Sequence, residues 1–305
     1  MRIFLTGGSG YIGSAVLDAL ARAGHDVTAV VRNGEKAAAV EKRGGHPLQA
    51  DLFEPESYAS AAASAEAWIH AAIDESPRGP ELDTLTADTL IAAARAAGSG
   101  LFIYTSGIWL LGETAEPADE KVTVNPIPHA AWRVPIEKAV LKAGAGDVRT
   151  AVVRPGLVYG GGRGFVGDLL KDANNGLVRV VGSGENHWPL VYDRDLGDLY
   201  ARLIAAPDAK GIYHANDEGD ERVNDIVEAI RESAHVRPSL RHVPLAEARK
   251  KMGTLADALA LDQKVRSPRA RALGWTPSLR SVAGNVSRLF EEYRRETAAE
   301  STARR

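Results

Sequence analysis

A glycine-rich turn near the N-terminus constrains this chain more than any other feature. Residues 6–13, TGGSGYIG, lie between a short apolar run, RIFLT, and a stretch with apolar residues at helical spacing. In such a strand–turn–helix unit, glycines permit a tight turn, a close approach to a pyrophosphate, and packing of the helix on the strand. The helix N-terminus adds free N–H groups and partial positive charge. The turn therefore predicts a dinucleotide site with contacts from Gly7, Ser9, Gly10, Tyr11, Ile12 and Gly13.

The order of the expected elements predicts the fold class. Over residues 1–160, short β-branched runs alternate with alanine-rich helical stretches. This pattern is typical of βαβ units, so we expect an α/β fold with a Rossmann-type, doubly wound parallel sheet. Beyond residue 160 the alternation weakens, and residues 161–294 predict a smaller C-terminal substrate-binding lobe, with some later segments adding to the sheet. Residues 295–305, charged and rich in Thr, Ser and Ala, predict a disordered tail.

The composition argues against several classes of function. The formal net charge of −3 leaves no global positive field to attract nucleic acid or an anionic membrane surface. The absence of cysteine excludes disulfides and thiolate chemistry, and it suits the cytoplasm, which is the expected location. No apolar run approaches the ~20 residues of a membrane helix, and the N-terminus lacks a signal-peptide core. The histidines show no metal-ligand spacing, so we expect no metal.

The end of the second expected strand bears on the choice of cofactor. A site for NAD(H) offers an acid to the ribose hydroxyls at this point, whereas residues 30–33 are VVRN. Arg32 and Asn33 are expected to contact the cofactor, and Arg32 can pair with a 2′-phosphate and stack on the adenine. We therefore expect NADP(H) to be preferred over NAD(H). The alternative is that Arg32 is a solvated surface charge.

Further motifs follow the glycine-rich turn in a specific order: ADL (50–52), IHAA (69–72), LFIYTSG (101–107), RPGLVYG (154–160) and WPLVYDRDLGDLY (188–200). Together they resemble the extended and atypical short-chain dehydrogenase/reductase superfamily, in particular its NAD-dependent epimerase/dehydratase branch. The resemblance implies that Asp51 accepts a hydrogen bond from the adenine amino group and that Leu52 lies against the ring. It places GIYHAND (211–217) and LGWTPS (273–278) in the C-terminal lobe. It also implies cofactor contacts from Ala71, Ala72, Thr105, Pro155 and Val158.

The usual catalytic motif of that superfamily is missing. Its acid is a Tyr four residues before a Lys, with a Ser or Thr upstream that polarises the substrate oxygen. The matching stretch here is HAAWRVPIEKAVL (129–141), in which Arg133 aligns with the Tyr and Glu137 with the Lys. A shift of one residue would substitute Trp132 and Ile136. The ordinary proton relay is therefore absent.

Four residues are the candidates for chemistry. The usual Ser or Thr position falls on Gly107, so Ser106 offers a neighbouring hydroxyl. Arg133 and Glu137 lie four apart on an expected helix and can form an ion pair. That pair is either a surface pair, or one in which Arg133 keeps Glu137 ionised for the nicotinamide ribose and holds a substrate oxygen. Arg133 cannot donate a proton at neutral pH. Another acid, or water, must supply it: the expected proton donor is Tyr159, with Tyr192 and His187 as alternatives. His129 ranks last because it precedes the helix.

Two classes of function follow from these observations. The first is an NADP(H)-dependent oxidoreductase that reduces a small organic carbonyl, imine or activated alkene, and an epimerase or dehydratase is its variant. The second is a non-catalytic NADP(H)-sensing regulator, which the missing motif favours. The glycine-rich stretch 160–164, GGGRG, and three tryptophans favour the enzyme, because they indicate a retained pocket for a small-molecule substrate. The resemblance also implies a homodimer through helices 81–97 and 130–143, although their alanine-rich faces suit a monomer as well.

Overall fold

Seven parallel strands form the central sheet of the structure, a computed structural model that describes residues 1–144 and 148–303. Their order is β11-β6-β5-β4-β1-β2-β3, and the chain reverses direction across the sheet between β1 and β4. A crevice at the carboxyl ends of the strands forms at such a switch point. The doubly wound α/β fold is thereby confirmed. The strands are β1 (Arg2–Thr6), β2 (Asp26–Val31), β3 (His46–Gln49), β4 (Ala67–His70), β5 (Leu101–Thr105), β6 (Arg149–Pro155) and β11 (Gly211–Ala215).

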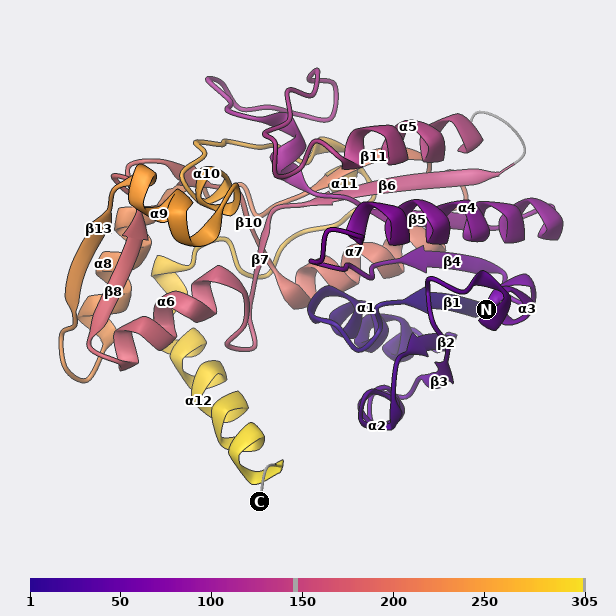
Figure 1. Cartoon of the computed structure of the whole chain (residues 1–305), viewed down its shortest axis with the longest axis horizontal. Helices are drawn as coiled ribbons and strands as arrows, with labels where there is room; N and C mark the ends of the chain where they lie inside the picture. The colour runs from indigo at the N-terminus through magenta and orange to yellow at the C-terminus, as the bar shows by residue number, and fades with distance from the viewer. Residues whose placement is uncertain (145–147, 304–305) are drawn as a thin grey trace.

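The central strands are apolar on both faces because helices cover both sides of the sheet (Figure 1). On one side α1 (Tyr11–Arg22) packs against α7 (Asp193–Ala205). The two helices approach closely at Gly197, where a Cβ would lie 2.4 Å from the carbonyl oxygen of Ala15. The other side carries α3 (Ala59–Ala63), α4 (Gly79–Ala97) and α5 (Arg133–Gly144), while α2 (Gly34–Glu41) follows β2 and α11 (Pro268–Ala272) contacts β11.

A second lobe with its own apolar core lies beyond the carboxyl end of the sheet (Figure 1). The core includes Tyr159, Trp188 and Ile226, which are buried together with residues from most of the lobe's helices and strands. The helices are α6 (Gly164–Asn174), α8 (Val223–Ser233), α9 (Leu245–Met252), α10 (Leu255–Leu259) and α12 (Val286–Ala303). The strands, paired two by two, are β10 (Leu190–Tyr192) with β7 (Leu157–Tyr159), β12 (Glu221–Arg222) with β9 (His187–Trp188), and β13 (Ser239–Val243) with β8 (Leu177–Val181).

Two segments differ from the sequence-based expectation. The GIYHA strand, expected in the C-terminal lobe, is β11 and pairs in parallel with β6 at the edge of the large sheet, where Trp275 of the LGWTPS stretch also packs. The tail, expected to be disordered from residue 295, continues α12 as far as Ala303, and residues 304–305 lie outside the described residues. Ion pairing of Arg295 with Glu291 at helical spacing supports this extension.

Two further expectations concern surfaces. The helices α4 and α5 contact one another on one side of the sheet, and their role in a homodimer stays a prediction. Among the described residues, the search for a helix long and apolar enough to cross a membrane found none.

Asp217, in the loop after β11, has a buried carboxyl group with few hydrogen-bond partners. Its side chain is buried, its Oδ1 accepts a hydrogen bond from Gly219 N at 2.9 Å, and its Oδ2 has no hydrogen-bond partner among the described residues. Burial raises the pKa of Asp217 to about 7, and the neighbouring carboxylates of Glu221 and Asp220 act in the same direction. The loop therefore holds a carboxyl group that prefers to be protonated in the folded state.

We expect this group to make the protein less stable as the pH rises from about 4 to about 7. In that interval the folded state binds the Asp217 proton more tightly than the unfolded chain, whose pKa is ordinary. Asp217→Asn should therefore raise the free energy of unfolding at pH 8 by roughly 2 to 4 kcal/mol and leave it unchanged at pH 4. Urea unfolding at both pH values measures this, with the exposed Asp208→Asn as control. Parallel pH profiles for wild type and Asp217→Asn would contradict the assignment.

Candidate active site

The glycine-rich turn is folded so tightly that side chains are excluded from it. Gly7 has a φ of 77°, and a Cβ there would lie 2.5 Å from Ala72 N. A Cβ at Gly13 would lie 2.0 Å from the carbonyl oxygen of Gly7, so α1 starts in contact with the turn. Gly10 is the residue before α1, whose first N–H groups have no partner within the helix. A cradle of this shape, beside unpaired N–H groups, suits the pyrophosphate of a dinucleotide.

The neighbouring strand ends bring most of the other expected cofactor residues to the same edge. Ala71 and Ala72 follow β4 and lie directly behind Gly7, as their small side chains allow. Asp51, after β3, is exposed, and its Oδ1 accepts a hydrogen bond from Phe53 N at 2.9 Å, while Leu52 packs on the sheet. These positions agree with a site in which an adenine lies near the ends of β2 and β3.

Arg32 and Asn33 follow β2 but differ in how they are engaged. Arg32 is exposed and makes no hydrogen bond or ion pair of its own with residues 1–144 or 148–303. The Oδ1 of Asn33 accepts a hydrogen bond from Lys36 N at 3.0 Å, so its side chain caps α2 instead of facing the cradle. Arg32 therefore remains available to a ligand, whereas the Asn33 side chain is engaged in capping α2.

A second arginine near this end of the site was missed by the sequence interpretation. Hydrogen bonds from Ser76 lower the pKa of Asp74, and the charges of Arg32 and Arg78 lower it further, so both arginines lie within electrostatic reach of this carboxylate. Arg78 also lies over the ring of Phe53, with 3.9 Å from Cζ to the ring centroid. It differs from Arg32 in that Glu81 binds it through two hydrogen bonds of 2.8 Å.

The ends of β5, β6 and β7 supply the remaining expected contacts. Thr105 Oγ1 lies 2.7 Å from the hydroxyl oxygen of Tyr200, so this hydroxyl is already engaged. Ser106 is buried, and its Oγ has no hydrogen-bond partner among the described residues, which leaves it free for a ligand. Pro155 ends β6 and is buried, and Val158 on β7 is half-buried.

Arg133 begins α5 and reaches back to the end of β5. Its Nη1 donates hydrogen bonds to the hydroxyl of Tyr104 at 3.2 Å and to the carbonyl oxygen of Thr105 at 3.1 Å. Its Cζ lies 4.3 Å from the ring centroid of Trp132. The side chain is 12% exposed, and Nε and Nη2 make no hydrogen bond with the part of the chain that the structure describes. Arg133 therefore presents free N–H groups beside the edge of the sheet.

The expected ion pair between Arg133 and Glu137 is wrong. Glu137 is buried and pairs instead with Arg154 of β6, through Nε–Oε1 at 3.0 Å and Nη2–Oε2 at 2.5 Å. Arg133 is drawn to another buried carboxylate, Asp83 of α4, whose Oδ2 lies 3.7 Å from Nη1. Helical spacing makes the first pair accessible, but two desolvated partners on other elements compete better. Both carboxylate oxygens of Glu137 thus accept hydrogen bonds from Arg154. The expected binding of Glu137 to the nicotinamide ribose loses its support.

The four proposed proton donors differ in their surroundings. Tyr159 lies in the core of the second lobe, donates a hydrogen bond to the carbonyl oxygen of Leu279, and has a pKa that burial raises far above its usual range. Tyr192 donates to Glu292, and His187 is bound by Asp262. His129 is different, because burial and then the charge of Arg133 lower its pKa below the ordinary 6.5. A titratable imidazole therefore lies within electrostatic reach of Arg133.

Three buried polar residues near Arg133 were not singled out from the sequence. His70 of β4, Asp83 of α4 and Tyr104 of β5 are each at most 1% exposed and are joined by hydrogen bonds. A usable signal existed: Asp83 falls on the apolar face of an alanine- and leucine-rich helix, where an acid needs a partner. The residues described contain no group of three or more metal-binding side chains placed to hold a metal.

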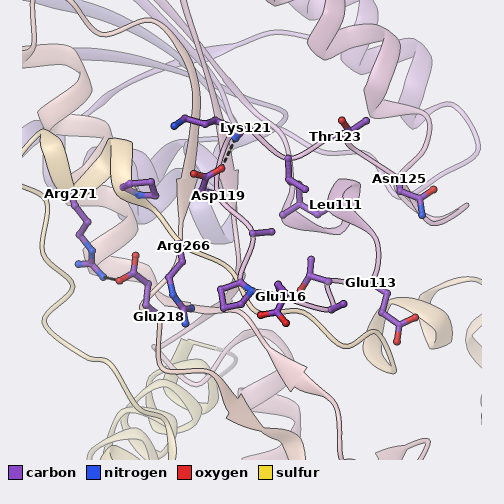
Figure 2. Close-up of a pocket in the computed structure, with 16 residues that line it drawn as sticks. Leu111, Glu113, Glu116, Asp119, Lys121, Thr123, Asn125, Glu218, Arg266 and Arg271 are labelled. Carbon is purple, nitrogen blue, oxygen red and sulfur yellow. Dashed lines mark hydrogen bonds and ion pairs between the residues drawn. The ribbon is translucent and has the colours of Figure 1, made fainter.

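An open cavity of about 1020 Å³ lies outside the predicted site (Figure 2). It is bordered by the loop 111–125, which follows a short 3₁₀ turn (Ile108–Leu111), and by Glu218, Arg266 and Arg271. Figure 2 shows Glu218 and Arg271 directed toward one another, in agreement with their ion pair at 3.3 Å. None of the residues proposed for cofactor or chemistry lines this cavity.

The buried pair of Glu137 and Arg154 leads to a stability prediction. Glu137→Gln removes the charge that neutralises a buried guanidinium, so we expect the free energy of unfolding to fall by about 3 kcal/mol. The affinity for a dinucleotide, measured below the melting temperature, should stay within about twofold of wild type. Glu247→Gln, which removes the carboxylate partnered by the exposed Arg241, serves as the matched control and should cost less than about 1 kcal/mol. Selective loss of dinucleotide affinity at unchanged stability would restore the ribose role.

Comparisons with known proteins agree with this geometry. The profile of the NAD-dependent epimerase/dehydratase family matches residues 3–216. An uncharacterised protein of Schizosaccharomyces pombe is 30% identical over 288 residues, which cover 91% of this chain and 95% of that protein. A 2-alkyl-3-oxoalkanoate reductase of Stenotrophomonas maltophilia is 29% identical over 252 residues, covering 75% and 76%.

The fold is also shared with solved structures. A crystal structure of a human epimerase family protein with NADPH superposes with a TM-score of 0.77 at 20% identity, covering 95% of this chain and 99% of that one. The long match to the family profile and the similarity to the yeast protein extend well beyond the glycine-rich turn. The chain therefore belongs to the NAD-dependent epimerase/dehydratase family and is an NAD(P)-dependent enzyme of the oxidoreductase type.

Proposed function

We propose that this protein is an NADP(H)-dependent reductase of a small organic carbonyl, imine or activated alkene. The observation that carries the proposal is Arg133: its guanidinium is fixed at the end of β5 with Nε and Nη2 free of hydrogen bonds to the described residues. Donors preorganised in this way stabilise an oxygen or nitrogen that gains negative charge. A reductase among the relatives of this chain supports the same class of reaction.

The residues that would hold the cofactor are the glycine cradle, Ala71 and Ala72 at the turn, and Asp51 at the adenosine end. When bound, a reduced nicotinamide supplies a hydride to the substrate. Ser106, whose buried Oγ lacks a partner, offers a hydrogen bond on the same edge. These residues bind and orient, and Arg133 holds the acceptor atom of the substrate.

A proton must also reach the product, and Arg133 cannot supply it because a guanidinium keeps its proton at neutral pH. His129 fills this role in our proposal. Its ring contacts Trp109 edge to face, with 5.4 Å between ring centroids, and Nδ1 lies 3.1 Å from Thr254 Oγ1. With a pKa below 6.5, the protonated fraction of His129 falls as the pH rises toward neutrality, so it is a stronger acid than a free imidazole.

The test is consumption of NADPH with a panel of ketones, imines and activated alkenes. We expect turnover with at least one class, and kcat/KM that decreases as the pH rises through the pKa of His129. His129→Gln should lower kcat by about 10²-fold and flatten this profile. Loss of consumption across the whole panel, with NADPH still bound, would favour the regulator instead.

The preference for NADP(H) is a separate proposal. It is supported by the exposed Arg32 at the end of β2, by the lack of an acid at positions 30–33, and by the NADPH that the human epimerase family protein contains. An arginine that makes no hydrogen bond or ion pair with the described residues can bind a 2′-phosphate in two parallel hydrogen bonds.

Arg32→Ala should weaken NADPH binding by about 10- to 100-fold and change NADH binding little, because only the 2′-phosphate contact is lost. Titration calorimetry with both dinucleotides measures the ratio. Arg43→Ala removes an equal charge on the far side of α2, where Arg43 pairs with Asp18, and should leave both affinities unchanged. Equal losses for NADPH and NADH in Arg32→Ala would contradict the preference.

A further inference from the structure

A chain of buried polar side chains runs from the glycine-rich turn to Arg133. Thr6, the last residue of β1, has its Oγ1 2.6 Å from His70 Nδ1, and His70 Nε2 lies 2.9 Å from Asp83 Oδ1. The hydroxyl of Tyr104 donates a hydrogen bond to Asp83 Oδ2. Arg133 then donates from Nη1 to the same hydroxyl. The chain crosses the ends of three adjacent strands, β1, β4 and β5.

The hydrogen-bond directions are set by Asp83. A carboxylate only accepts, so both His70 Nε2 and the Tyr104 hydroxyl must donate to it. Having donated its single proton, the Tyr104 oxygen can receive a hydrogen bond only as an acceptor, and it receives one from Arg133. Burial raises the pKa of Tyr104 well above its usual range, so this hydroxyl keeps its proton. Arg133 Nη1 thus has two acceptors, the carbonyl oxygen of Thr105 and the Tyr104 hydroxyl, and Asp83 orients the second of them.

The charge of Asp83 is stabilised by several partners of the hydrogen-bonded chain together. Burial acts to raise the pKa of Asp83, but the interactions with His70 and Arg133 prevail, and its pKa stays below the ordinary value. The same carboxylate lies 3.7 Å from Arg133 Nη1 without a direct hydrogen bond. The Tyr104 hydroxyl therefore bridges the buried Asp83 carboxylate and the Arg133 guanidinium, and it keeps the two groups at this separation.

We infer that Asp83 and Tyr104 are positioning residues that hold the Arg133 guanidinium with Nη1 turned inward, so that Nε and Nη2 face the substrate. The inference rests on the proposed function for its catalytic meaning, and the orientation itself can be measured without turnover. Thr6 and His70 extend the same hydrogen-bonded chain to the residue before Gly7, so the donor to the substrate and the cofactor cradle share one rigid support.

The test is a double-mutant cycle with Tyr104→Phe and Arg133→Ala, because phenylalanine keeps the buried ring and removes only the hydroxyl. If Tyr104 acts through Arg133, Tyr104→Phe lowers kcat by about tenfold in the wild-type background, leaves KM for NADPH unchanged, and has no further effect on Arg133→Ala. Tyr58→Phe is the matched control: Tyr58 is buried in the same core, and its hydroxyl has no hydrogen-bond partner in the described residues. We expect it to behave as wild type.

A second measurement reports on Arg133 directly. In protein labelled with ¹⁵N-arginine, NMR of the Arg133 side chain, assigned with Arg133→Lys, should show restricted guanidinium rotation in wild type and Tyr58→Phe, and rotation at least tenfold faster in Tyr104→Phe. Restricted rotation in Tyr104→Phe, or equal losses of kcat in both backgrounds of the cycle, would overturn the inference. If no substrate in the panel is turned over but the NMR difference is present, the proposed function fails and the positioning role stands.

Discussion

Backbone contact at the glycine-rich turn is the constraint on which the rest of the structure depends. The carbonyl oxygen of Gly7 would lie only 2.0 Å from a Cβ at position 13, so α1 can start only where the turn leaves room for it. The position of its first turn fixes how α1 lies against the sheet. Helix α7 then packs on α1 through the close approach at Gly197. Since α7 follows β10 and precedes β11, the packing on α1 also determines how the chain returns from the second lobe to the edge of the sheet.

Buried charge is the second organising feature, and it is divided between two groups. Glu137 and Arg154 neutralise one another between α5 and β6. Asp83, by contrast, is shared among His70, Tyr104 and Arg133 and lies next to the site. A buried ion pair of the first kind adds little net stability, but removing only one of its two partners lowers the free energy of unfolding strongly. The second group keeps one cation oriented and partly unsatisfied, which is the condition for binding a substrate atom.

Much of the fold could be predicted from the sequence because its signals are local. The runs that became β1, β2, β4, β5 and β6 are rich in apolar residues, whereas β3, HPLQ, carries no such signal. The helix expected over residues 11–23, after the glycine-rich turn, is α1 (Tyr11–Arg22). The edge strand β11 was expected in the wrong lobe because GIYHA contains nothing that selects β6 as its partner over a strand of the second lobe. Helix α12 was expected to end early because exposed alanines, charges and threonines have similar composition in a surface helix and in a disordered tail.

The sequence named candidate residues for the site, but it did not predict which side chains pair with one another. Arg133 and Glu137 align with the usual catalytic pair, and their catalytic roles stay predictions. Helical spacing could reveal only partners on the same helix. Their actual partners, Asp83 and Arg154, come from α4 and β6, 50 residues before and 17 residues after them along the chain. Side-chain pairing over such separations depends on how the elements pack, which a local pattern does not contain. His129 was ranked low for the same reason, since its proximity to Arg133 arises from the path of the preceding loop.

One contact ties the two lobes together at the mouth of the crevice. Tyr11, the first residue of α1, donates a hydrogen bond of 2.8 Å to the carbonyl oxygen of Gly160, and the guanidinium of Arg163 lies over its ring. Gly160, Gly161 and Gly162, which all have positive φ, follow β7 and lead into α6 of the second lobe. Tyr11 therefore belongs both to the expected phosphate site at the start of α1 and to the contact with the second lobe, so a substitution of Tyr11 acts on both.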